Sequence, residues 1–296
     1  MAFASRPLYD WHLRTRMLAL GHRTLVMGIL NVTPDSFSDA GLFFTPKDAP
    51  IRALEHAITM LDQGADIIDL GGESTRPGST RITPDEEQAR VLPVLSAILR
   101  ERPSTIVSID TFHASTARYA VQAGAEIVND VSGHLWDEAM SSTCAQLGCG
   151  AVLMHTRGTP SEWRSLPALE STEIAPMIVR ELEARVLAVT AGGVARNRLV
   201  LDPGIGFGKR LDENYPILAH LDQLHSLGLP LLVGASRKSF LAHTLRQTIR
   251  TAPDTRLNST TAANVAAILS GAHILRVHDV QPAVEVAAIA DRILKD

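Results

Sequence analysis

Eight short apolar runs in the sequence each end in, or lead directly into, polar residues that could do chemistry. The clearest case is 199–209, where Asp202 and Pro203 close the apolar run and glycines follow at alternate positions. The other seven runs stop at Asn31, Gly72-Glu73, Asp110, Asn129, His155, Ser236 and Arg276. A carboxylate at the C-terminal end of a buried parallel strand faces a pocket. Eight such endings predict one functional rim on one barrel.

Three of these side chains, with one lysine, could hold a flat nitrogen heterocycle. Asp110, Asn129 and Asp202 would point into the barrel mouth beside Lys238. A carboxylate can accept the paired N–H donors of an aminopyrimidinone edge, whereas phosphate alone would not attract two carboxylates. The alternative is that Asp110 and Asp202 only cap the loops after their strands.

A second group of residues offers donors to an anion. We expect Ser236 to be the N-cap of the helix after the seventh strand, whose free N–H groups favour an anion. Arg276 and His278 end the eighth strand two residues apart and therefore on one side. Because barrels of this kind commonly bind phosphate after strands seven and eight, a diphosphate there would meet both side chains. Asn31 could bind Mg²⁺ or a phosphate, although Thr-Pro-Asp-Ser after it also fits an ordinary turn.

Three further polar residues leave their roles open. Arg76, next to Ser74 and Thr75, could clamp a phosphate or carboxylate, or it could be a solvated turn arginine. We predict that His113 lies on the surface. His155 is either a neutral core histidine or a catalytic one.

The scaffold that must position these residues is an alternation of strands and helices. The predicted strands are 24–31, 66–71, 105–110, 126–130, 150–155, 199–202, 230–235 and 274–278. The predicted helices are 51–64, 84–99, 115–123, 176–191, 260–269 and 282–294, with Thr83 as the N-cap of the second. Eight almost uniformly apolar strands favour a closed (β/α)8 TIM barrel over a doubly wound sheet. Residues 1–23 fit no repeat and are predicted to form an arm or hairpin that closes the barrel floor, so the barrel domain is 24–296.

Composition limits the classes of protein to which this chain can belong. The 296 residues are 45% hydrophobic, and barrels commonly use about 250 residues. A net charge of −4 gives no basic footprint for nucleic acid. No apolar run reaches the length of a membrane span, and charged residues interrupt the first twenty positions, so we expect a cytoplasmic protein without a membrane partner. Cys144 and Cys149 have poor zinc spacing and are expected to be buried or helical.

Several segments, read together, resemble the dihydropteroate synthase family of folate biosynthesis. The segments are MGILNVTPDSFSDAG, GADIIDLGGESTRPGS, SIDT, IVNDVSG, LMHTRGTP, LDPGIGFGK, GASRKSF and RVHDV, in the family's order from Met27 to Val280. The resemblance implies a (β/α)8 barrel, and a transferase that joins 6-hydroxymethyl-7,8-dihydropterin diphosphate to p-aminobenzoate, with 7,8-dihydropteroate and pyrophosphate as products. Sulfonamides, which mimic p-aminobenzoate, should compete.

The resemblance also implies how the site residues are divided. The implied pterin-binding residues are Asp110, Asn129, Met154, Asp202 and Lys238. The implied diphosphate-binding residues are Asn31, Thr75, Arg276 and His278, with Mg²⁺ bound to Asn31. The implied p-aminobenzoate-binding residues are Thr75, Arg76, Pro77, Phe207, Lys238 and Ser239. The catalytic set would be Asp110, Lys238, Arg276 and His278. Thr156-Arg157 and Ile205 depart from the family's usual residues, which affects only the shape of the pocket.

The expected mechanism is an SN1-like displacement, and a homodimer through the last helices is implied. Two other functions remain open at this stage. One is a non-catalytic pterin-binding paralogue. The other is a methyltetrahydrofolate:corrinoid methyltransferase, which would not need Arg276, His278 or the 74–77 loop. No corrinoid-binding segment is visible in the sequence.

Overall fold

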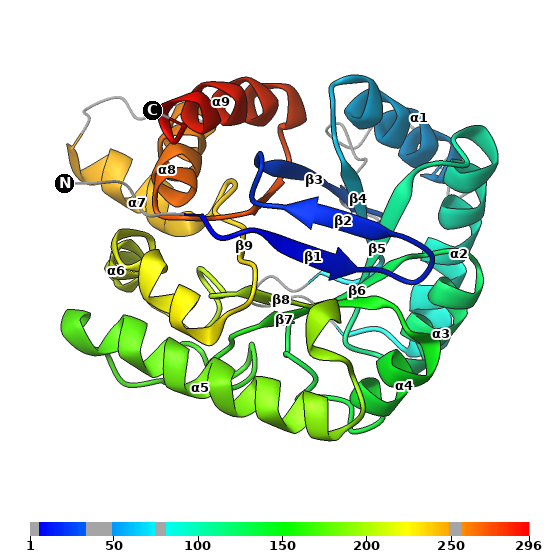
Figure 1. Ribbon diagram of the computed structural model, residues 1–296, viewed down its shortest axis with the longest axis horizontal. Helices are drawn as coiled ribbons and strands as arrows, with labels where there is room; N and C mark the ends of the chain where they lie inside the picture. The colour runs from blue at the N-terminus through cyan, green and yellow to red at the C-terminus, as the bar shows by residue number, and fades with distance from the viewer. Residues whose placement is uncertain (1–5, 34–48, 75–80, 249–255, 296) are drawn as a thin grey trace.

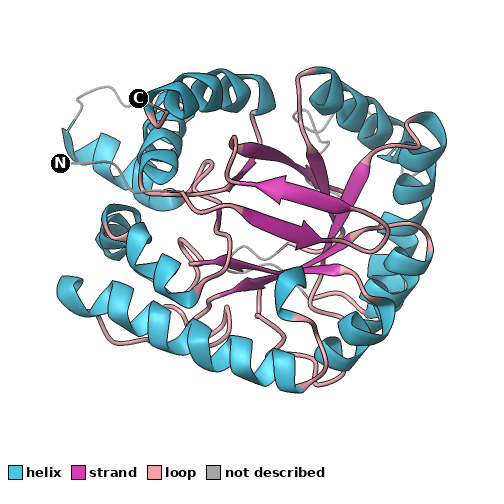
Figure 2. Cartoon of the chain, in the orientation of Figure 1, coloured by secondary structure: helices cyan, strands magenta, loops and turns pink. Residues whose placement is uncertain are grey.

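Eight parallel strands form a nearly closed barrel with helices around it (Figures 1 and 2). The computed structural model describes residues 6–33, 49–74, 81–248 and 256–295. The barrel strands are β3 (Leu25–Asn31), β4 (Ile67–Gly71), β5 (Ile106–Asp110), β6 (Ile127–Asp130), β7 (Gly150–Met154), β8 (Leu199–Asp202), β9 (Leu232–Val233) and β10 (Ile274–Val277). They pair in the order β8-β7-β6-β5-β4-β3-β10-β9, and a single bridge between Leu201 and Leu231 joins the two ends. The predicted TIM barrel is confirmed.

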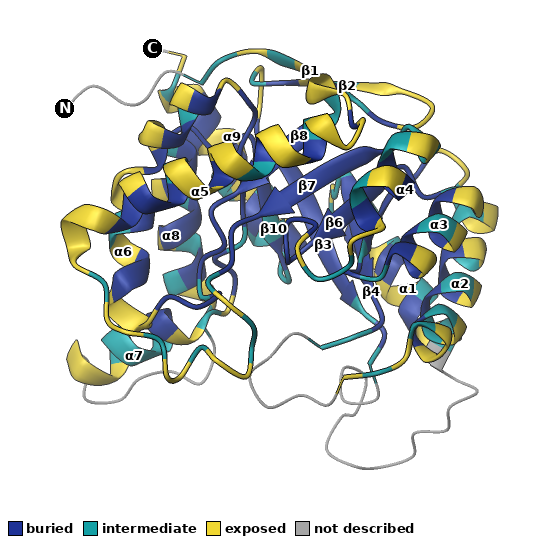
Figure 3. Cartoon of the chain, turned by 90° about the horizontal axis from the view of Figure 1, so that it is seen from below, coloured by how far each residue is buried: buried dark blue, intermediate teal, exposed yellow. Residues whose placement is uncertain are grey.

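The helices lie outside the strands and turn their exposed faces away from them (Figure 3). The α-helices are α1 (Ala49–Asp62), α2 (Pro84–Glu101), α3 (Ala114–Gln122), α4 (Met140–Leu147), α5 (Ser171–Ala191), α6 (Tyr215–Ala219), α7 (Ser239–Thr248), α8 (Leu257–Leu269) and α9 (Val280–Ile293). The 3-10 helices are η1 (Arg196–Arg198), η2 (Leu211–Asn214) and η3 (Leu221–Leu227). Within the described ranges, none of these helices is long and apolar enough to cross a membrane.

Local sequence explains some helix boundaries and not others. Thr83 caps α2 as predicted, because its side chain accepts a hydrogen bond from the Glu86 N–H at 3.2 Å. Helix α5 begins five residues before the predicted start, with Pro176 inside it. The carbonyl that Pro176 cannot bond belongs to Thr172, which is exposed in the first turn and can bond to water instead.

A two-stranded hairpin closes the floor of the barrel. Strands β1 (Tyr9–His12) and β2 (Met17–Leu20) pair antiparallel and cross the barrel end that faces the viewer in Figure 1. The Trp11 indole N–H donates to the Arg198 carbonyl, just before β8, at 2.9 Å. Trp11, Leu13 and Leu20 pack on the first inward-facing residues of the strands. The hairpin therefore seals the N-terminal ends of the strands, and the opposite end is left for chemistry.

The inward-facing side chains change from apolar to polar along each strand. The floor layer contains Met27, Ile67, Ile106, Ile127, Val152, Val200, Leu232 and Ile274. Because side chains on one face of a strand recur every second residue, the next inward positions are Asp69, Ser108, Asn129, Asp202 and Arg276. Asp110 follows Ser108 one step higher. An apolar floor thus supports a polar layer toward the C-terminal ends of the strands.

Candidate active site

Arg276 on β10 lies at the centre of the polar layer. Its Nε donates to Asp69 Oδ2 on β4 at 2.6 Å, and its Nη2 donates to Asp110 Oδ2 on β5 at 2.5 Å. Asp69 Oδ2 also accepts a hydrogen bond from Asn129 Nδ2 on β6 at 3.0 Å. Burial lowers the pKa of Arg276, but the two carboxylates outweigh it and the pKa is raised. The guanidinium is therefore charged at every physiological pH.

Lys238 and Asp202 join the same constellation from the β9 and β8 side. Lys238 Nζ lies 4.1 Å from the centre of the Phe207 ring, a cation–π contact. Asp202 Oδ1 accepts a hydrogen bond from the Gly204 N–H at 2.7 Å. Burial and the charge of Arg276 lower the pKa of Lys238 to about 8, against the opposing charges of Asp202 and Asp110. The structure thus brings Asp110, Asn129, Asp202 and Lys238 to one end of the barrel.

Burial changes the pKa values of two carboxyl groups in this site, those of Asp110 and Asp202. Burial raises the pKa of Asp110 to about 7, although Arg276 lowers it. Burial likewise raises the pKa of Asp202, against the backbone N–H of Gly204 and the charge of Lys238. Pairs of groups whose surroundings move their pKa values toward neutrality are typical of functional sites.

An apolar cluster borders the polar layer at the C-terminal ends of the strands. Met154, Phe207, Phe112 and Val131 are buried together. Met154 ends β7 and Val131 directly follows β6, whereas Phe112 and Phe207 lie in the loops after β5 and β8. Trp163 packs edge-on against Phe207 with ring centres 5.3 Å apart. A flat ring held by the polar layer would therefore meet apolar and aromatic walls.

His278 lies two residues after Arg276 and contacts Ser236. Its Nδ1 lies 3.1 Å from Ser236 Oγ, which also accepts from the His278 N–H at 3.2 Å. Burial and the neighbouring Arg237 and Arg276 lower the pKa of His278 to about 3. The imidazole is therefore neutral at pH 7 and can hydrogen-bond a ligand without adding charge.

The predicted role of Ser236 as an N-cap is wrong. Helix α7 begins three residues later, at Ser239, which is exposed. Arg237 has a left-handed backbone (φ 57°), which turns the chain before the helix starts. Its side chain pairs with Asp279, which accepts from Nε at 3.0 Å and from Nη2 at 2.5 Å. The Ser236 hydroxyl is free to bond His278 for this reason.

Asn31 ends β3 next to the acidic side of the site. A Cβ placed on Gly71 would lie 3.5 Å from Asn31 Oδ1 and 3.6 Å from Asp110 Oδ2, so the glycine separates the two oxygens without filling the space. In the parts of the chain that the structure describes, no three His, Cys, Asp or Glu side chains are arranged as a metal site. An ion that takes most of its ligands from substrate and water would fit beside Asn31.

The histidines and cysteines have structural positions. His113 was expected on the surface, and this is wrong: it is half-buried, stacks on Phe112, and its Nε2 lies 3.5 Å from Glu73 Oε2. The contact with Glu73 raises the pKa of His113. His155 is buried with its Nε2 3.0 Å from Glu181 Oε2, which favours the core interpretation. Cys144 and Cys149 are both buried and free, as expected.

Two buried charged residues escaped the sequence analysis. Asp69 is completely buried in β4 and contacts two predicted site residues. Lys209 Nζ donates to the carbonyls of His155, Pro203 and Gly204 at 2.8–3.0 Å and pins the glycine-rich loop to β7. Both lie in otherwise apolar or glycine-rich runs, and charged residues are almost never fully buried unless they are paired. That position is the signal that could have identified them. Thr75, Arg76 and Pro77 lie outside the described residues.

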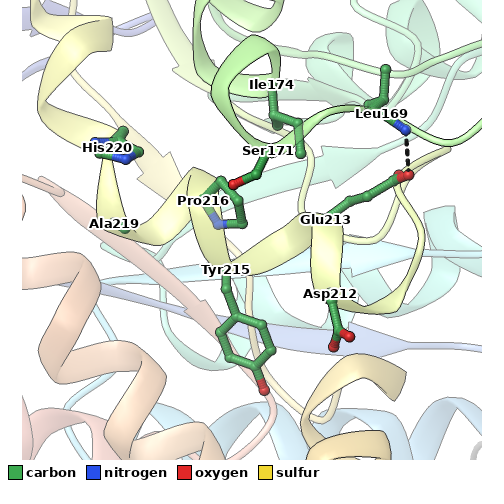
Figure 4. Close-up of a pocket in the computed structure, with 9 residues that line it drawn as sticks. All are labelled: Leu169, Ser171, Ile174, Asp212, Glu213, Tyr215, Pro216, Ala219 and His220. Atoms are coloured by element: carbon green, nitrogen blue, oxygen red, sulfur yellow. Dashed lines mark hydrogen bonds between the residues drawn. The ribbon is translucent and has the colours of Figure 1, made fainter.

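A separate pocket of about 510 Å³ lies between the start of α5, η2 and α6 (Figure 4). Its lining residues are Leu169, Ser171, Ile174, Asp212, Glu213, Tyr215, Pro216, Ala219 and His220. The Glu213 carboxylate is already engaged, because it accepts from the Leu169 N–H at 2.8 Å and from the Arg210 N–H at 2.6 Å. None of the predicted site residues lines this pocket, so it does not replace the barrel mouth as the candidate site.

Comparison with known proteins finds relatives that match nearly the whole chain. The model of the family described as pterin binding enzyme matches residues 27–278. A dihydropteroate synthase from Synechocystis is 41% identical over 97% of this chain and 93% of its own length. The structure of the Yersinia pestis dihydropteroate synthase with a sulfonamide drug complex is 39% identical, with a TM-score of 0.86, over 97% of this chain and 100% of that one. The Xanthomonas albilineans dihydropteroate synthase with 4-aminobenzoic acid is 36% identical, with a TM-score of 0.85, and covers 97% and 98%.

Proposed function

The chain belongs to the pterin-binding enzymes and has the activity of a dihydropteroate synthase, and on this premise we propose how its residues divide the work. The reaction joins 6-hydroxymethyl-7,8-dihydropterin diphosphate to p-aminobenzoate and releases pyrophosphate. The observation that carries the assignment of residues is the convergence of Asp110, Asn129, Lys238 and Arg276 at one end of the barrel, beside Asp202.

The pterin ring would lie in the polar layer. The carboxylates of Asp110 and Asp202 would accept the N–H donors of the aminopyrimidinone edge, and Asn129 Oδ1 would accept a further one. Lys238 would donate to a ring acceptor, and Met154 would pack against the ring face. The 4.1 Å distance between Lys238 Nζ and Phe207 supports this, because the ammonium is already held at the border of the apolar walls.

The diphosphate would lie above Arg276. In the described parts of the chain no acceptor forms a hydrogen bond with Arg276 Nη1. Because carboxylates hold the other two nitrogens of the guanidinium, Nη1 would face the phosphate oxygens. His278, Asn31 and Thr75 would complete the subsite. The Asn31 amide oxygen would hold Mg²⁺ together with phosphate oxygens and water, since magnesium sites of this kind need few protein ligands. Such an ion neutralises charge on the leaving diphosphate when it is bound.

The p-aminobenzoate would bind at the outer edge of the same mouth. Phe207 would offer its ring as one wall, Lys238 and Ser239 would meet the substrate from the start of α7, and Thr75, Arg76 and Pro77 would contribute the other wall. The position of Phe207 between Lys238 and Trp163 supports this arrangement. Sulfonamides, which mimic p-aminobenzoate, would compete for this subsite.

The bond between the methylene carbon and the diphosphate oxygen would break first, with both electrons leaving on the oxygen. Arg276 would stabilise the charge that grows on the leaving group. The electron-rich dihydropterin would carry the positive charge on its exocyclic carbon, and the carboxylate of Asp110 would stabilise it. The arylamine nitrogen, which is neutral near pH 7, would then form the new carbon–nitrogen bond and release its proton to solvent.

A coupled assay tests the function. With pterin diphosphate and p-aminobenzoate, the protein should release one pyrophosphate for each dihydropteroate formed. Pterin binding without pyrophosphate release would instead identify a non-catalytic paralogue, and methyl transfer to cobalamin a corrinoid methyltransferase. Arg76→Ala should chiefly lower turnover with the arylamine. Unchanged kcat and KM for this variant would remove the 75–77 segment from the arylamine subsite.

We also propose that two copies of the chain associate through the last helices. Ile289 and Ile293 on α9 are 67% and 43% exposed, and Leu257 on α8 is 36% exposed. Helices α8 and α9 lie side by side (Figure 1), so these side chains could share one interface. Light scattering should give the mass of a dimer, and Ile289→Lys should shift it toward the monomer. A monomeric wild type would contradict the proposal.

A further inference from the structure

Asp69 occupies the middle of β4 and is the one charged residue in that strand. Its side chain is completely buried and follows Ile67 on the inward face. A buried ion pair adds little stability, because apolar side chains of similar volume stabilise a core equally well or better. Packing of the barrel interior therefore does not explain an aspartate at this position. The explanation must lie in the contacts that its side chain makes.

The first contact fixes the direction of an amide. Asp69 Oδ2 accepts a hydrogen bond from Asn129 Nδ2 at 3.0 Å. A carboxylate can only accept, so it selects the NH₂ end of the amide and turns the oxygen end away. Asn129 Oδ1 is thereby presented as an acceptor. Without Asp69 the amide could rotate and offer a donor to the same ligand atom.

The second contact fixes the plane of a guanidinium. The same Asp69 oxygen accepts from Arg276 Nε at 2.6 Å, and Asp110 Oδ2 holds Nη2 at 2.5 Å. Two carboxylates on different strands thus hold two edges of one rigid, planar group. The third nitrogen, Nη1, is left in a single defined direction.

We infer that Asp69 is a positioning residue that orients both the pterin-binding amide of Asn129 and the diphosphate-binding guanidinium of Arg276. This inference rests on the roles proposed above for those two residues. One carboxylate oxygen links the two ends of the substrate, so the ring and its leaving group are held in a fixed relation. Because these side chains are oriented before the substrate binds, less binding free energy goes into ordering them and more is available to position the reacting bond.

Isothermal titration calorimetry with 6-hydroxymethylpterin and with pyrophosphate tests the inference. Asp69→Asn keeps the shape of the side chain but removes its negative charge, so the oxygen that both partners share can offer each of them only a weaker, neutral hydrogen bond. We expect each Kd to rise at least about tenfold, the loss for a hydrogen bond to a charged group. Asp66→Asn is the matched control, because Asp66 also pairs with an arginine, Arg23, but at the barrel floor. It should bind both ligands as the wild type does.

The Asn129→Ala background shows whether Asp69 acts through the amide. In that background Asp69→Asn should cause no further loss of pterin affinity. An equal loss in both backgrounds, or wild-type Kd values for Asp69→Asn, would overturn the inference while the site assignment stands. If Asn129→Ala and Arg276→Ala themselves bind as the wild type does, the assignment of the site fails instead.

If Asp69→Asn does not unfold cooperatively, Asn129→Asp is a second variant that tests the inference. In Asn129→Asp the new carboxyl must be protonated to donate to Asp69. Its pterin affinity relative to the wild type should therefore rise at least about tenfold as the pH falls from 8 to 6. The charged groups that face the new carboxyl are Asp69, Asp110, Asp202, Lys238 and Arg276, and the ratio to the wild type removes the pH dependence that the two proteins share. A ratio that does not change with pH would overturn the inference.

Discussion

At the level of single residues, the pKa values of Asp110 and Lys238 predict a narrow pH range for pterin binding. Asp110 must be ionised to accept N–H donors, and its pKa of about 7 means that binding weakens as the pH falls below 7. Lys238 must be an ammonium, and its pKa of about 8 means that binding weakens above 8. Calorimetry with a pterin that carries no diphosphate avoids titration of the ligand's own phosphates.

Asp110→Asn should remove the acidic limb of this profile and keep the basic one. If the variant weakens below pH 7 as the wild type does, the acidic limb belongs to another group.

The direct contacts of the pterin predict a loss of binding on substitution. Asp202→Asn and Lys238→Ala should each abolish measurable pterin binding in calorimetry. Asp202→Asn leaves the buried Lys238 without its counter-charge, and Lys238→Ala leaves a pterin ring atom without its donor. Asp279→Asn, which breaks the exposed ion pair with Arg237 beyond the rim, is the control and should bind pterin normally. Wild-type affinity in either site variant would remove that residue from the pocket.

The site residues that end strands could be predicted from the sequence, whereas Asp69, which lies inside a strand, could not. Asp110, Asn129, Asp202 and Arg276 interrupt apolar runs at or near their ends, where a pocket is expected. Asp69 was predicted only as part of the strand 66–71, because the local sequence does not show whether a carboxylate inside a strand has a buried partner. Its partner Arg276 is 207 residues away in the chain. Only the closed sheet brings them together.

At the level of elements, the glycine-rich loop after β8 depends on a close backbone approach. Gly204 has φ +68°, and a Cβ there would lie 1.8 Å from the His155 carbonyl oxygen. Gly204→Ala should lower the free energy of unfolding by at least about 3 kcal/mol and abolish pterin binding, since the Gly204 N–H also holds Asp202. Urea unfolding and calorimetry measure the two effects.

Gly148→Ala separates the backbone effect from the contact. Gly148 has φ +60°, but its nearest neighbour to a Cβ is 3.7 Å away. This substitution should lower the free energy of unfolding by only about 1–2 kcal/mol and leave the enzyme fully active. If the two variants lose the same stability, the contact with His155 does not matter.

The elements that sequence patterns predicted worst are those whose limits are set by tertiary contacts. The strand expected over 230–235 has only two ladder residues, since β9 meets β8 through a single bridge. Helix α4 was not predicted, because its short run of small and polar residues has a weak apolar stripe. The start of α7 depends on the left-handed Arg237 and its ion pair with Asp279, which the N-cap rule does not include.

At the level of the whole molecule, buried neutral histidines predict sensitivity to acid. Burial lowers the pKa of His134 to about 4, so in the unfolded chain, with its ordinary value near 6.5, the group binds a proton that the folded state resists. The stability that depends on neutral His134 is complete above pH 6.5 and is lost as the pH falls toward 4. Asp110 and Asp130 act in the opposite direction, because their pKa values are raised to about 7 and about 6.

His134→Asn isolates this term. His134 has a left-handed backbone (φ 66°), which asparagine tolerates well. Between pH 7 and pH 5 the variant should lose about 1–2 kcal/mol less stability than the wild type in urea unfolding. Equal losses would mean that His134 is not the group responsible.

The whole-molecule architecture followed from the sequence, because eight alternating units leave few topologies and right-handed crossovers select one. Residues 1–23 were expected to form an arm or hairpin at the floor because they fit no repeat. The seal that the hairpin makes depends on Trp11 reaching Arg198 across 187 residues. Oligomeric state and cytoplasmic location stay predictions, and the segment 75–77 lies outside the described residues.

A crystal soaked with a pterin and pyrophosphate measures most directly whether one barrel mouth holds the ring and its leaving group. We predict the pterin edge within about 3 Å of the Asp110 and Asp202 carboxylates and of Asn129 Oδ1, with pyrophosphate on Arg276 Nη1. A pterin bound elsewhere, such as in the separate pocket beside Tyr215, or a pyrophosphate that leaves Arg276 untouched, would contradict this assignment.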